Sequence, residues 1–281
     1  MKRRFFDFAV IIMFFISASC FIYSPLSQCL NENAALKTTE QYDTQIIETT
    51  EIQKQEQFKK AKQYNKKLTN NKKSNLNYEK EYQNILNIKD GMMGYIEIPK
   101  INVKLPIYHG TDKVTLEKGI GHLKNSTLPI GGKGTHSVLT GHTGVPSAKL
   151  FDDINLLKIN DCFQIKIFDN TLVYKIKRIK TVLPNKFGKL LETQSSKDEV
   201  TLITCVPYGI NNLRLLVTGE RTKSKIEYKE KQIAKSAKDR LIIRIIIILI
   251  VAATLSIINL YSFINHKRQV DKLSTQYDKR R

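Results

Sequence analysis

The residues best suited to chemistry stand in one stretch near the carboxyl end, Thr201–Arg214. An apolar strand there ends at Cys205, a turn rich in Pro, Gly and Asn follows, and a second strand opens with Arg214. If the two strands pair as a hairpin, the thiol and the guanidinium can face one pocket from neighbouring strands. A fixed cation favours the thiolate form of a cysteine, and a guanidinium can donate hydrogen bonds to a carbonyl under attack. The stretch therefore predicts a nucleophile beside an electrophilic helper.

His142 is the side chain that we expect to serve this cysteine as general acid and base. It follows an apolar stretch, Thr135–Thr140, and stands between Gly141 and Gly144, which is typical of a side chain exposed where a strand meets a loop. A histidine and a cysteine far apart in sequence are usual in Cys/His enzymes, because the fold brings them together. The pattern predicts nucleophilic catalysis at Cys205.

Three other histidines compete for this role: His109, His122 and His136. His136 lies six residues before His142, so an unbroken strand would place both on one side, and we expect His136 to be packed. A zinc site formed by His136, His142 and Cys205 is a different interpretation. That spacing fits no compact zinc pattern and lacks a fourth ligand.

Two further alternatives concern the cysteines and the acidic residues. A disulfide between Cys162 and Cys205 could form in an oxidising compartment and would disable the site, but chemistry explains the sequence around Cys205 better. Cys162 is otherwise expected to be a small buried side chain. A calcium site, for which no loop signature exists, could draw on five carboxylates: Asp112, Glu117, Glu192, Asp198 and Glu199.

The residues that must position this site predict a mostly β domain. Glycine becomes frequent from Gly91 onward, and residues 95–98, 163–167 and 172–177 alternate between apolar and polar, as half-buried strands do. Ser147 could cap a short helix between two of these strands, whose apolar face is formed by Leu150, Phe151, Ile154 and Leu157. About six to eight short strands with few helices predict a closed or nearly closed barrel.

These motifs together resemble those of the sortases, membrane-anchored cysteine transpeptidases of Gram-positive bacteria. The resemblance rests on Gly141-His142-Thr143-Gly144, on Thr201-Leu202-Ile203-Thr204-Cys205 and on the Arg214 that follows. It extends to residues 94–101, 105–110 and 215–221, and so covers roughly residues 91–222. It implies a closed sortase-type β-barrel of about eight strands with short helices, preceded by a helical N-terminal segment and flanked by membrane spans.

Sortase membership would also imply the reaction. Cys205 would cut a Leu-Pro-x-Thr-Gly-like sorting signal between Thr and Gly through a thioester, with His142 as acid and base and Arg214 steadying the oxyanion. Thr204 and Thr143 are expected to contact the substrate. The amino-acid sequence of the core is similar to that of class C, the pilin-polymerising sortases. In that class the accepting amine is a lysine of another pilin subunit. No cofactor and no metal are needed for this chemistry.

Three alternatives to a pilin-polymerising enzyme stay open at this point. A sortase of another class would attach surface proteins to the cell-wall peptide instead of to a pilin lysine. A membrane-bound scaffold or adhesin could have kept the barrel without activity. A hydrolytic cysteine protease would release only hydrolysed peptide when an amine acceptor is abundant.

The chain departs from class C at two places. Those enzymes often carry an Asp-Pro-aromatic lid before the barrel, whereas residues 26–90 contain neither proline nor glycine. Either another part of residues 65–90 covers the site, for example around Tyr78 or Tyr82, or the site stands open. Pilin sortases also frequently have arginine after the active histidine, where this chain has Thr143.

Both ends of the chain predict membrane segments. Residues 5–23 are almost wholly apolar and follow a Lys-Arg-Arg run, so they form a signal peptide or an anchor, and residues 241–264 are long enough to cross a bilayer. Basic residues beside each span put both termini in the cytoplasm and the middle outside the cell. The domains that we expect are a first span (1–25), a helical membrane-proximal, lid-like region (26–90), the catalytic barrel (91–222), a charged linker (223–240), a transmembrane helix (241–264) and a basic cytoplasmic tail (265–281).

The formal net charge of +20 invites an interpretation as a nucleic-acid-binding protein. No recognisable nucleic-acid module accompanies it, and the expected topology places the basic middle outside the cell, so no nucleic-acid partner is predicted. Many of the lysines lie within residues 54–80, as a solvated face or as a surface attracted to an anionic cell envelope. The partners that we expect are proteins bearing sorting signals, a lysine or cell-wall amine, and the lipid bilayer.

Overall fold

The computed structural model describes residues 2–69, 77–88, 90–186, 188, 196–223, 239, 241–258, 261 and 268. Most of the expected linker, the expected basic tail and Glu192 lie outside the described residues. So do the side chains of Tyr78 and of residues 1–11, 14, 15 and 18. Residues 27–237 form one compact unit, and residues 1–26 with residues 238–281 form another.

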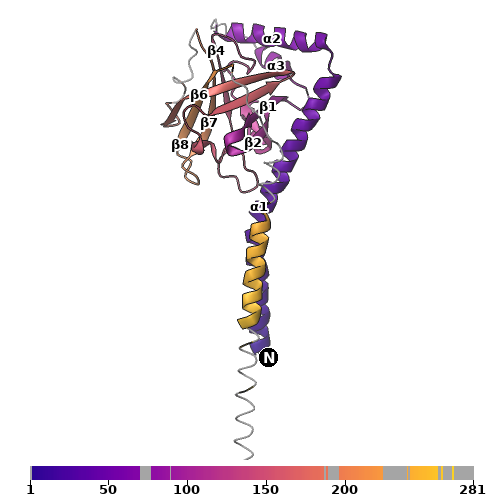
Figure 1. Ribbon diagram of the computed structural model, residues 1–281, viewed down its shortest axis with the longest axis vertical. Coiled ribbons are helices and arrows are strands. Elements are labelled where there is room, and N and C mark those ends of the chain that lie inside the picture. Colours follow the sequence, from indigo (N-terminus) through magenta and orange to yellow (C-terminus); the bar gives the residue numbers. More distant parts are fainter. Residues whose placement is uncertain are drawn as a thin grey trace, which may run out of the picture. The chain divides into compact units, whose positions relative to one another are not determined.

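The larger unit contains a closed β-barrel with the strand order β1-β2-β3-β4-β7-β8-β6-β5 (Figure 1). This confirms the mostly β fold and the barrel that the sequence predicts. The strands are β1 (Met92–Ile98), β2 (Val103–His109), β3 (Ile120–His122), β4 (Thr135–Thr140), β5 (Cys162–Ile167), β6 (Asn170–Val182), β7 (Asp198–Val206) and β8 (Leu213–Arg221).

Two pairs of neighbouring strands run parallel, and the others run antiparallel. β2 pairs with β3 in parallel, joined by the short helix α4 (Lys113–Lys118), and β4 pairs with β7 in parallel after a long crossover. β7 and β8 form the antiparallel hairpin that the Pro/Gly/Asn-rich turn predicts. The parallel β4–β7 pair determines where the candidate site lies, because it brings the carboxyl ends of two strands that are distant in sequence to the same edge of the barrel.

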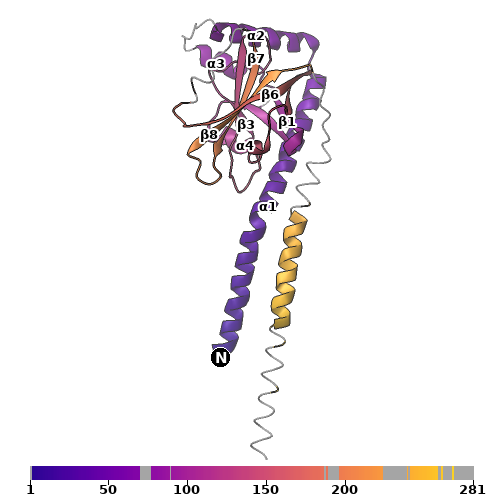
Figure 2. The same ribbon diagram turned by 60° about the vertical axis from the view of Figure 1, so that its left-hand side comes forward.

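Helices before the barrel cover its side and one of its ends. They are α1 (Lys2–Glu48), α2 (Glu51–Thr69) and α3 (Asn77–Asn84). Figures 1 and 2 both show α1 running along the side of the barrel near β1, and α2 crossing one end. The buried face of α2 includes Ala61, Tyr64 and Leu68, which recur at the three- to four-residue spacing of an amphipathic helix.

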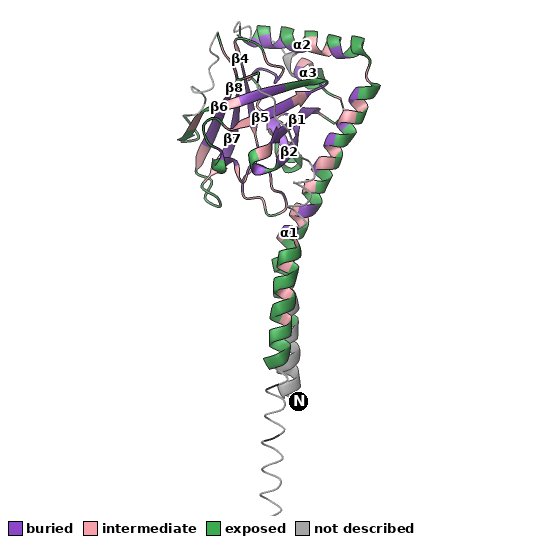
Figure 3. Ribbon diagram, viewed as in Figure 1, coloured by how far each residue is buried: buried purple, intermediate pink, exposed green. Residues whose placement is uncertain are grey.

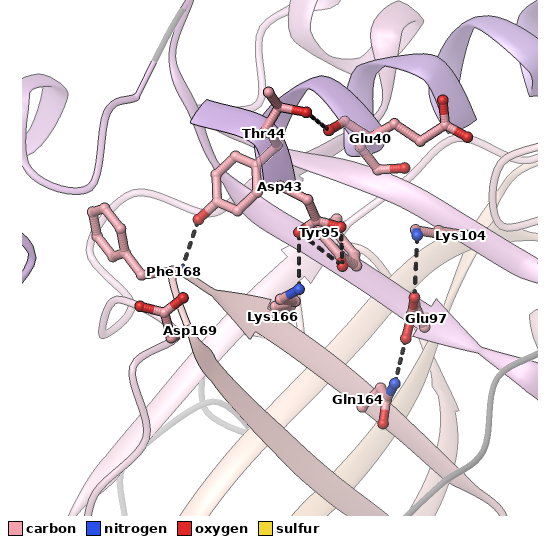
Figure 4. A network of polar contacts seen from close by, with 12 residues as sticks. Glu40, Asp43, Thr44, Tyr95, Glu97, Lys104, Gln164, Lys166, Phe168 and Asp169 are labelled. Atoms are coloured by element: carbon pink, nitrogen blue, oxygen red, sulfur yellow. Dashed lines mark hydrogen bonds and ion pairs between the residues drawn. The ribbon is translucent and has the colours of Figure 1, made fainter. Parts of the chain in front are cut away.

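Contacts with α1 explain why β1 is buried at every position rather than at alternate ones (Figure 3). The hydroxyl of Tyr42 in α1 donates to the carbonyl oxygen of Met93 and accepts from the N–H of Phe168. Asp43 accepts hydrogen bonds from the Tyr95 hydroxyl at 3.0 Å and from the Lys166 ammonium at 2.9 Å (Figure 4). The outer face of the barrel here is therefore a helix-packing surface.

A buried ion pair lies beside these contacts, on β1, β2 and β5. The Lys104 ammonium lies 3.5 Å from the Glu97 carboxylate, which also accepts from the Gln164 amide (Figure 4). Lys104 further sits 4.7 Å from the centre of the Tyr95 ring. Buried charges need such compensation, because an isolated one would cost several kcal/mol.

One local expectation in the crossover from β4 to β5 is wrong. The helix capped by Ser147 is replaced by a single 3₁₀ turn, η2 (Ile154–Leu156), and the Ser147 carbonyl instead accepts from Asn31 of α1. The four apolar side chains of the expected helix face are nevertheless all buried. Burial of an apolar set does not require a regular helix.

The smaller unit holds the one helix among the described residues that is long and apolar enough to cross a membrane, Leu241–Ile258. Within this unit, the Arg244 guanidinium lies 5.3 Å from the Phe21 ring centre. The other expected span, residues 5–23, is helical as part of α1. Because many of its side chains lie outside the described residues, a membrane span there stays a prediction.

Candidate active site

Cys205 and Arg214 are paired residues of the β7–β8 hairpin. Their Cα atoms are register partners across the two strands, so their side chains project from the same face of the ladder. Both residues are half-buried, and Cys205 is a free thiol. The structure thus brings together the thiol and the guanidinium that the sequence predicts as nucleophile and electrophilic helper.

His142 reaches the same edge of the barrel from β4. Thr140 of β4 pairs with Ile203 of β7, and the Gly141 N–H donates to the Ile203 carbonyl oxygen at 3.1 Å. His142 and Cys205 are each two residues beyond this pair: His142 follows the end of β4, and Cys205 lies on β7, which runs parallel to β4. Like Cys205, His142 is half-buried, which leaves its imidazole accessible to a substrate.

Thr143 and Thr204 join these two strand ends. Their hydroxyl groups contact each other, and the Thr204 hydroxyl also donates to the Gly141 carbonyl oxygen at 2.8 Å. Both residues are buried, with 8% and 2% of their surface exposed. The two hydroxyls hold the chain after β4 against β7, and contact of either residue with substrate stays a prediction.

The Arg214 guanidinium is oriented by the turn that precedes it. Its Nη1 donates to the carbonyl oxygens of Asn211 and Leu213, each at 3.0 Å. Among the described residues, no partner binds its Nε or Nη2 groups. A guanidinium has five N–H donors in a fixed plane, so this anchoring leaves donors to point at a substrate oxygen.

The rival histidines are all buried and hydrogen-bonded inside the fold. The two ring nitrogens of His109 contact the carbonyl oxygens of Ile85 and Gly91. Burial lowers the pKa of His109, and it lowers the pKa of His122 to about 4. His136 contacts the Thr201 hydroxyl at 2.7 Å. Of the described histidines, His142 alone is half-buried rather than buried.

The disulfide alternative is contradicted and the metal alternatives find no site in the described part of the chain. Cys162 and Cys205 are both free thiols. No group of three or more His, Cys, Asp or Glu side chains among the described residues could hold a metal ion. Two of the carboxylates considered for a calcium site have other partners: Asp112 accepts from the Thr115 N–H, and Asp198 from the Tyr174 hydroxyl and the Gly132 N–H.

Tyr82, a candidate to cover the site, is buried elsewhere. Its hydroxyl lies 2.9 Å from the His122 Nδ1 and accepts from the Gly110 N–H at 2.9 Å. These partners stand at the carboxyl ends of β2 and β3. Tyr82 is fully buried among these groups, so it packs inside the fold instead of lying as an exposed cover over Cys205.

The comparisons with solved structures decide the family. Sortase C1 of Streptococcus agalactiae has 40% sequence identity and a TM-score of 0.64, and the match covers 67% of this chain and 100% of the other. A Clostridium perfringens sortase C with the C-terminal cell wall sorting motif has 44% identity and a TM-score of 0.61, covering 68% of this chain and 100% of the other. This chain belongs to the sortase family.

The sequence comparisons agree with this assignment. The Sortase domain model matches residues 96–222. Sortase D of Bacillus subtilis is 34% identical over 132 residues, and sortase A of Bacillus anthracis is 31% identical over 137 residues. These matches span 46% and 49% of this sortase, and 63% of the length of each relative.

Proposed function

We propose that this sortase is a membrane-anchored cysteine transpeptidase that transfers the acyl part of a cleaved sorting signal to an amine. The register pairing of Cys205 with Arg214 carries the proposal, with His142 just past the end of β4, the strand that runs parallel to β7. Family membership supports the same chemistry. A thiol, an imidazole and a guanidinium at one strand edge supply the nucleophile, acid/base and oxyanion donor of acyl transfer.

In the first half-reaction, the Cys205 thiolate attacks the threonine carbonyl of a Leu-Pro-x-Thr-Gly-like signal. The Sγ–C bond forms, and the negative charge on the oxygen is stabilised by N–H groups of Arg214 that the turn leaves available. His142 donates a proton to the glycine nitrogen as the C–N bond breaks. The products are a thioester on Cys205 and a free amino group on the departing glycine fragment.

In the second half-reaction, an amine attacks the thioester carbonyl. His142, now neutral, accepts a proton from the attacking nitrogen, and the Cys205 thiolate leaves. The new bond is an amide. The structural neighbours are mainly class C enzymes, which supports a pilin lysine as the acceptor rather than a cell-wall amine. The apolar helix Leu241–Ile258 supports anchoring in the cell membrane, with the barrel outside and the carboxyl-terminal tail in the cytoplasm.

The test uses the full-length protein in detergent micelles with a Leu-Pro-x-Thr-Gly peptide and two acceptors, a lysine-bearing pilin peptide and a cell-wall peptide amine. We expect release of the glycine fragment and ligation to the lysine peptide, with both lost in Cys205→Ala and kept in Cys162→Ala, a matched removal of another free thiol. Ligation to the cell-wall amine alone would identify an anchoring sortase. Hydrolysis alone would identify a protease, and no cleavage at all would identify a non-catalytic scaffold.

A further inference from the structure

The segment that carries His142, residues 141–152, has neither helix nor strand, although it bears the proposed acid/base. We call it the His142 loop. A general acid must be held close to the geometry of proton transfer, and a loop of this length does not hold itself. The contacts that immobilise it therefore bear directly on catalysis.

Phe151 fixes the loop from inside the barrel. Its ring is fully buried against Gly141, where an added Cβ would lie 2.8 Å from a ring carbon. Its N–H donates to the His142 carbonyl oxygen at 3.0 Å. The backbone on each side of the His142 Cα is thus in contact with Phe151.

Asp152 closes the loop from the other side. Its Oδ1 accepts from the Gly144 N–H at 2.9 Å, and its Oδ2 accepts from the Leu150 N–H at 3.0 Å. Gly144 lies two residues past His142 and has φ +81°, a conformation that other residues rarely adopt. Hydrogen bonds from N–H groups to a carboxylate are shorter and stronger than those to a neutral acceptor. One side chain therefore ties together both limbs of the loop.

Helix α1 braces the same loop from outside. The Asn31 amide donates to the Ser147 carbonyl oxygen at 2.6 Å, and the Gln28 amide donates to the Pro146 carbonyl oxygen at 3.4 Å. Asn31 and Gln28 are three residues apart, so they lie on one face of the helix. The loop is thus held between α1 and the end of the barrel.

We propose that Asp152 is a positioning residue for His142, which it serves through the N–H groups of Gly144 and Leu150, with α1 as the outer brace. The proposal rests on the acid/base role given to His142 under the proposed function. Loss of the carboxylate frees the backbone two residues after His142. Proton transfer by His142 then becomes slower, whereas the affinity for the sorting peptide does not change. The turnover rate falls and KM stays.

Asp153 supplies a matched control. It is half-buried like its neighbour, but its carboxylate pairs with the Lys149 ammonium at 2.5 Å. Among the described residues it has no hydrogen bond to the backbone beside His142. Any effect of removing a carboxylate at this end of the loop that is unrelated to His142 should appear equally in Asp153→Ala, since Asp153 directly follows the loop.

The experiment compares Asp152→Ala, Asp152→Asn and Asp153→Ala in the full-length protein in detergent micelles, with the Leu-Pro-x-Thr-Gly peptide. For Asp152→Ala we expect kcat to fall roughly tenfold at a KM within about twofold of the original. Asp152→Asn keeps one acceptor oxygen and should recover part of the loss, and Asp153→Ala should stay within about twofold in kcat. Equal losses in the two alanine variants, or a raised KM with kcat unchanged, would overturn the proposal.

A second measurement keeps the proposal testable if Asp152→Ala is merely less stable. In protein with ¹³C-labelled histidine, Asp152→Ala should shift or broaden the His142 ring signal and leave those of His109 and His122 in place. An unchanged His142 signal, or equal changes in all three, would reject the positioning role. The same turnover assay on His142→Ala separates the two claims, since full activity there refutes the acid/base role itself before Asp152 is considered.

Discussion

The two ends of the barrel both contain histidine, but they differ in how far the histidine and its neighbours are buried. At the end bearing the carboxyl termini of β2 and β3, Tyr82, His109 and His122 are buried together. Their polar atoms contact one another or backbone groups. At the end bearing the carboxyl termini of β4 and β7, His142, Cys205 and Arg214 are half-buried. We call these the closed end and the site end.

The difference shows where histidine and tyrosine serve stability and where histidine can serve chemistry. A buried histidine with both nitrogens in contact with partners is fixed, and its proton affinity is lowered because burial disfavours the charged ring. A half-buried histidine beside a free thiol can exchange a proton with substrate. Perturbation of the closed end should therefore change stability alone, whereas perturbation of the site end should change turnover alone.

The largest effect is expected from Arg214→Ala at the site end. Loss of an oxyanion donor lowers kcat by about 10²–10³, or about 3–4 kcal/mol of barrier, with little change in unfolding free energy. Arg214→Lys keeps the charge and loses the planar donor set, so it should recover only part of the rate. Peptide-cleavage kinetics and denaturant unfolding measure both quantities. A loss of stability that matches the loss of rate would contradict the assignment.

The pH dependence of stability should come partly from the closed end. The His122 pKa is about 4 in the folded protein because of burial, against about 6.5 in an unfolded chain. The neutral ring contributes stability above about pH 6.5, and about 3 kcal/mol is lost as the pH falls through the window down to about 4. Denaturant unfolding from pH 7 to 4 measures this slope. His122→Gln should flatten it, and a slope unchanged by His122→Gln would refute the contribution.

Tyr82→Phe removes the hydroxyl at the centre of the closed end. The change leaves the His122 Nδ1 and the Gly110 N–H without this partner, so unfolding free energy should fall by about 1–3 kcal/mol. Turnover of the sorting peptide below the melting transition should stay unchanged. A drop in kcat without a drop in stability would indicate that Tyr82 takes part in the chemistry after all.

The smallest effect tests the brace between α1 and the His142 loop. Asn31→Ala removes one surface hydrogen bond, to the Ser147 carbonyl oxygen, so unfolding free energy should change by less than about 1 kcal/mol. We expect kcat to fall about threefold at unchanged KM, because the loop loses its outer support. Asn33→Ala, on the same helix and equally exposed, is the control. An equal kcat in the two variants would show that α1 does not support the His142 loop.

The sequence predicts the site end better than the closed end, because the Cys205–Arg214 hairpin is formed by residues close together in the chain. The hairpin that pairs Cys205 with Arg214 is specified by its own turn residues, and alternating patterns specify the strands. The parallel pairing that delivers His142 is not local. No local pattern in the sequence predicts it.

Other features depend on tertiary contacts that no local pattern records. The burial of Tyr82 beside His122 depends on where α3 meets the barrel, and the bond between Thr143 and Thr204 depends on the β4–β7 register. The contacts of Phe151 and Asp152 with the His142 loop leave a weak signal in the sequence. Glycines bracket His142 at the positions where a close approach and a φ above zero are required. From the sequence alone, these glycines predict only a side chain exposed where a strand meets a loop.

Intact-mass analysis of the acyl-enzyme tests the central claim most directly. The full-length protein is mixed with the sorting peptide and quenched in acid, and its fragments are then sequenced by mass spectrometry. We predict a mass increase equal to the Leu-Pro-x-Thr acyl group on Cys205, discharged when the lysine peptide is added. An adduct on Cys162, or no adduct while the peptide is still cleaved, would contradict the account.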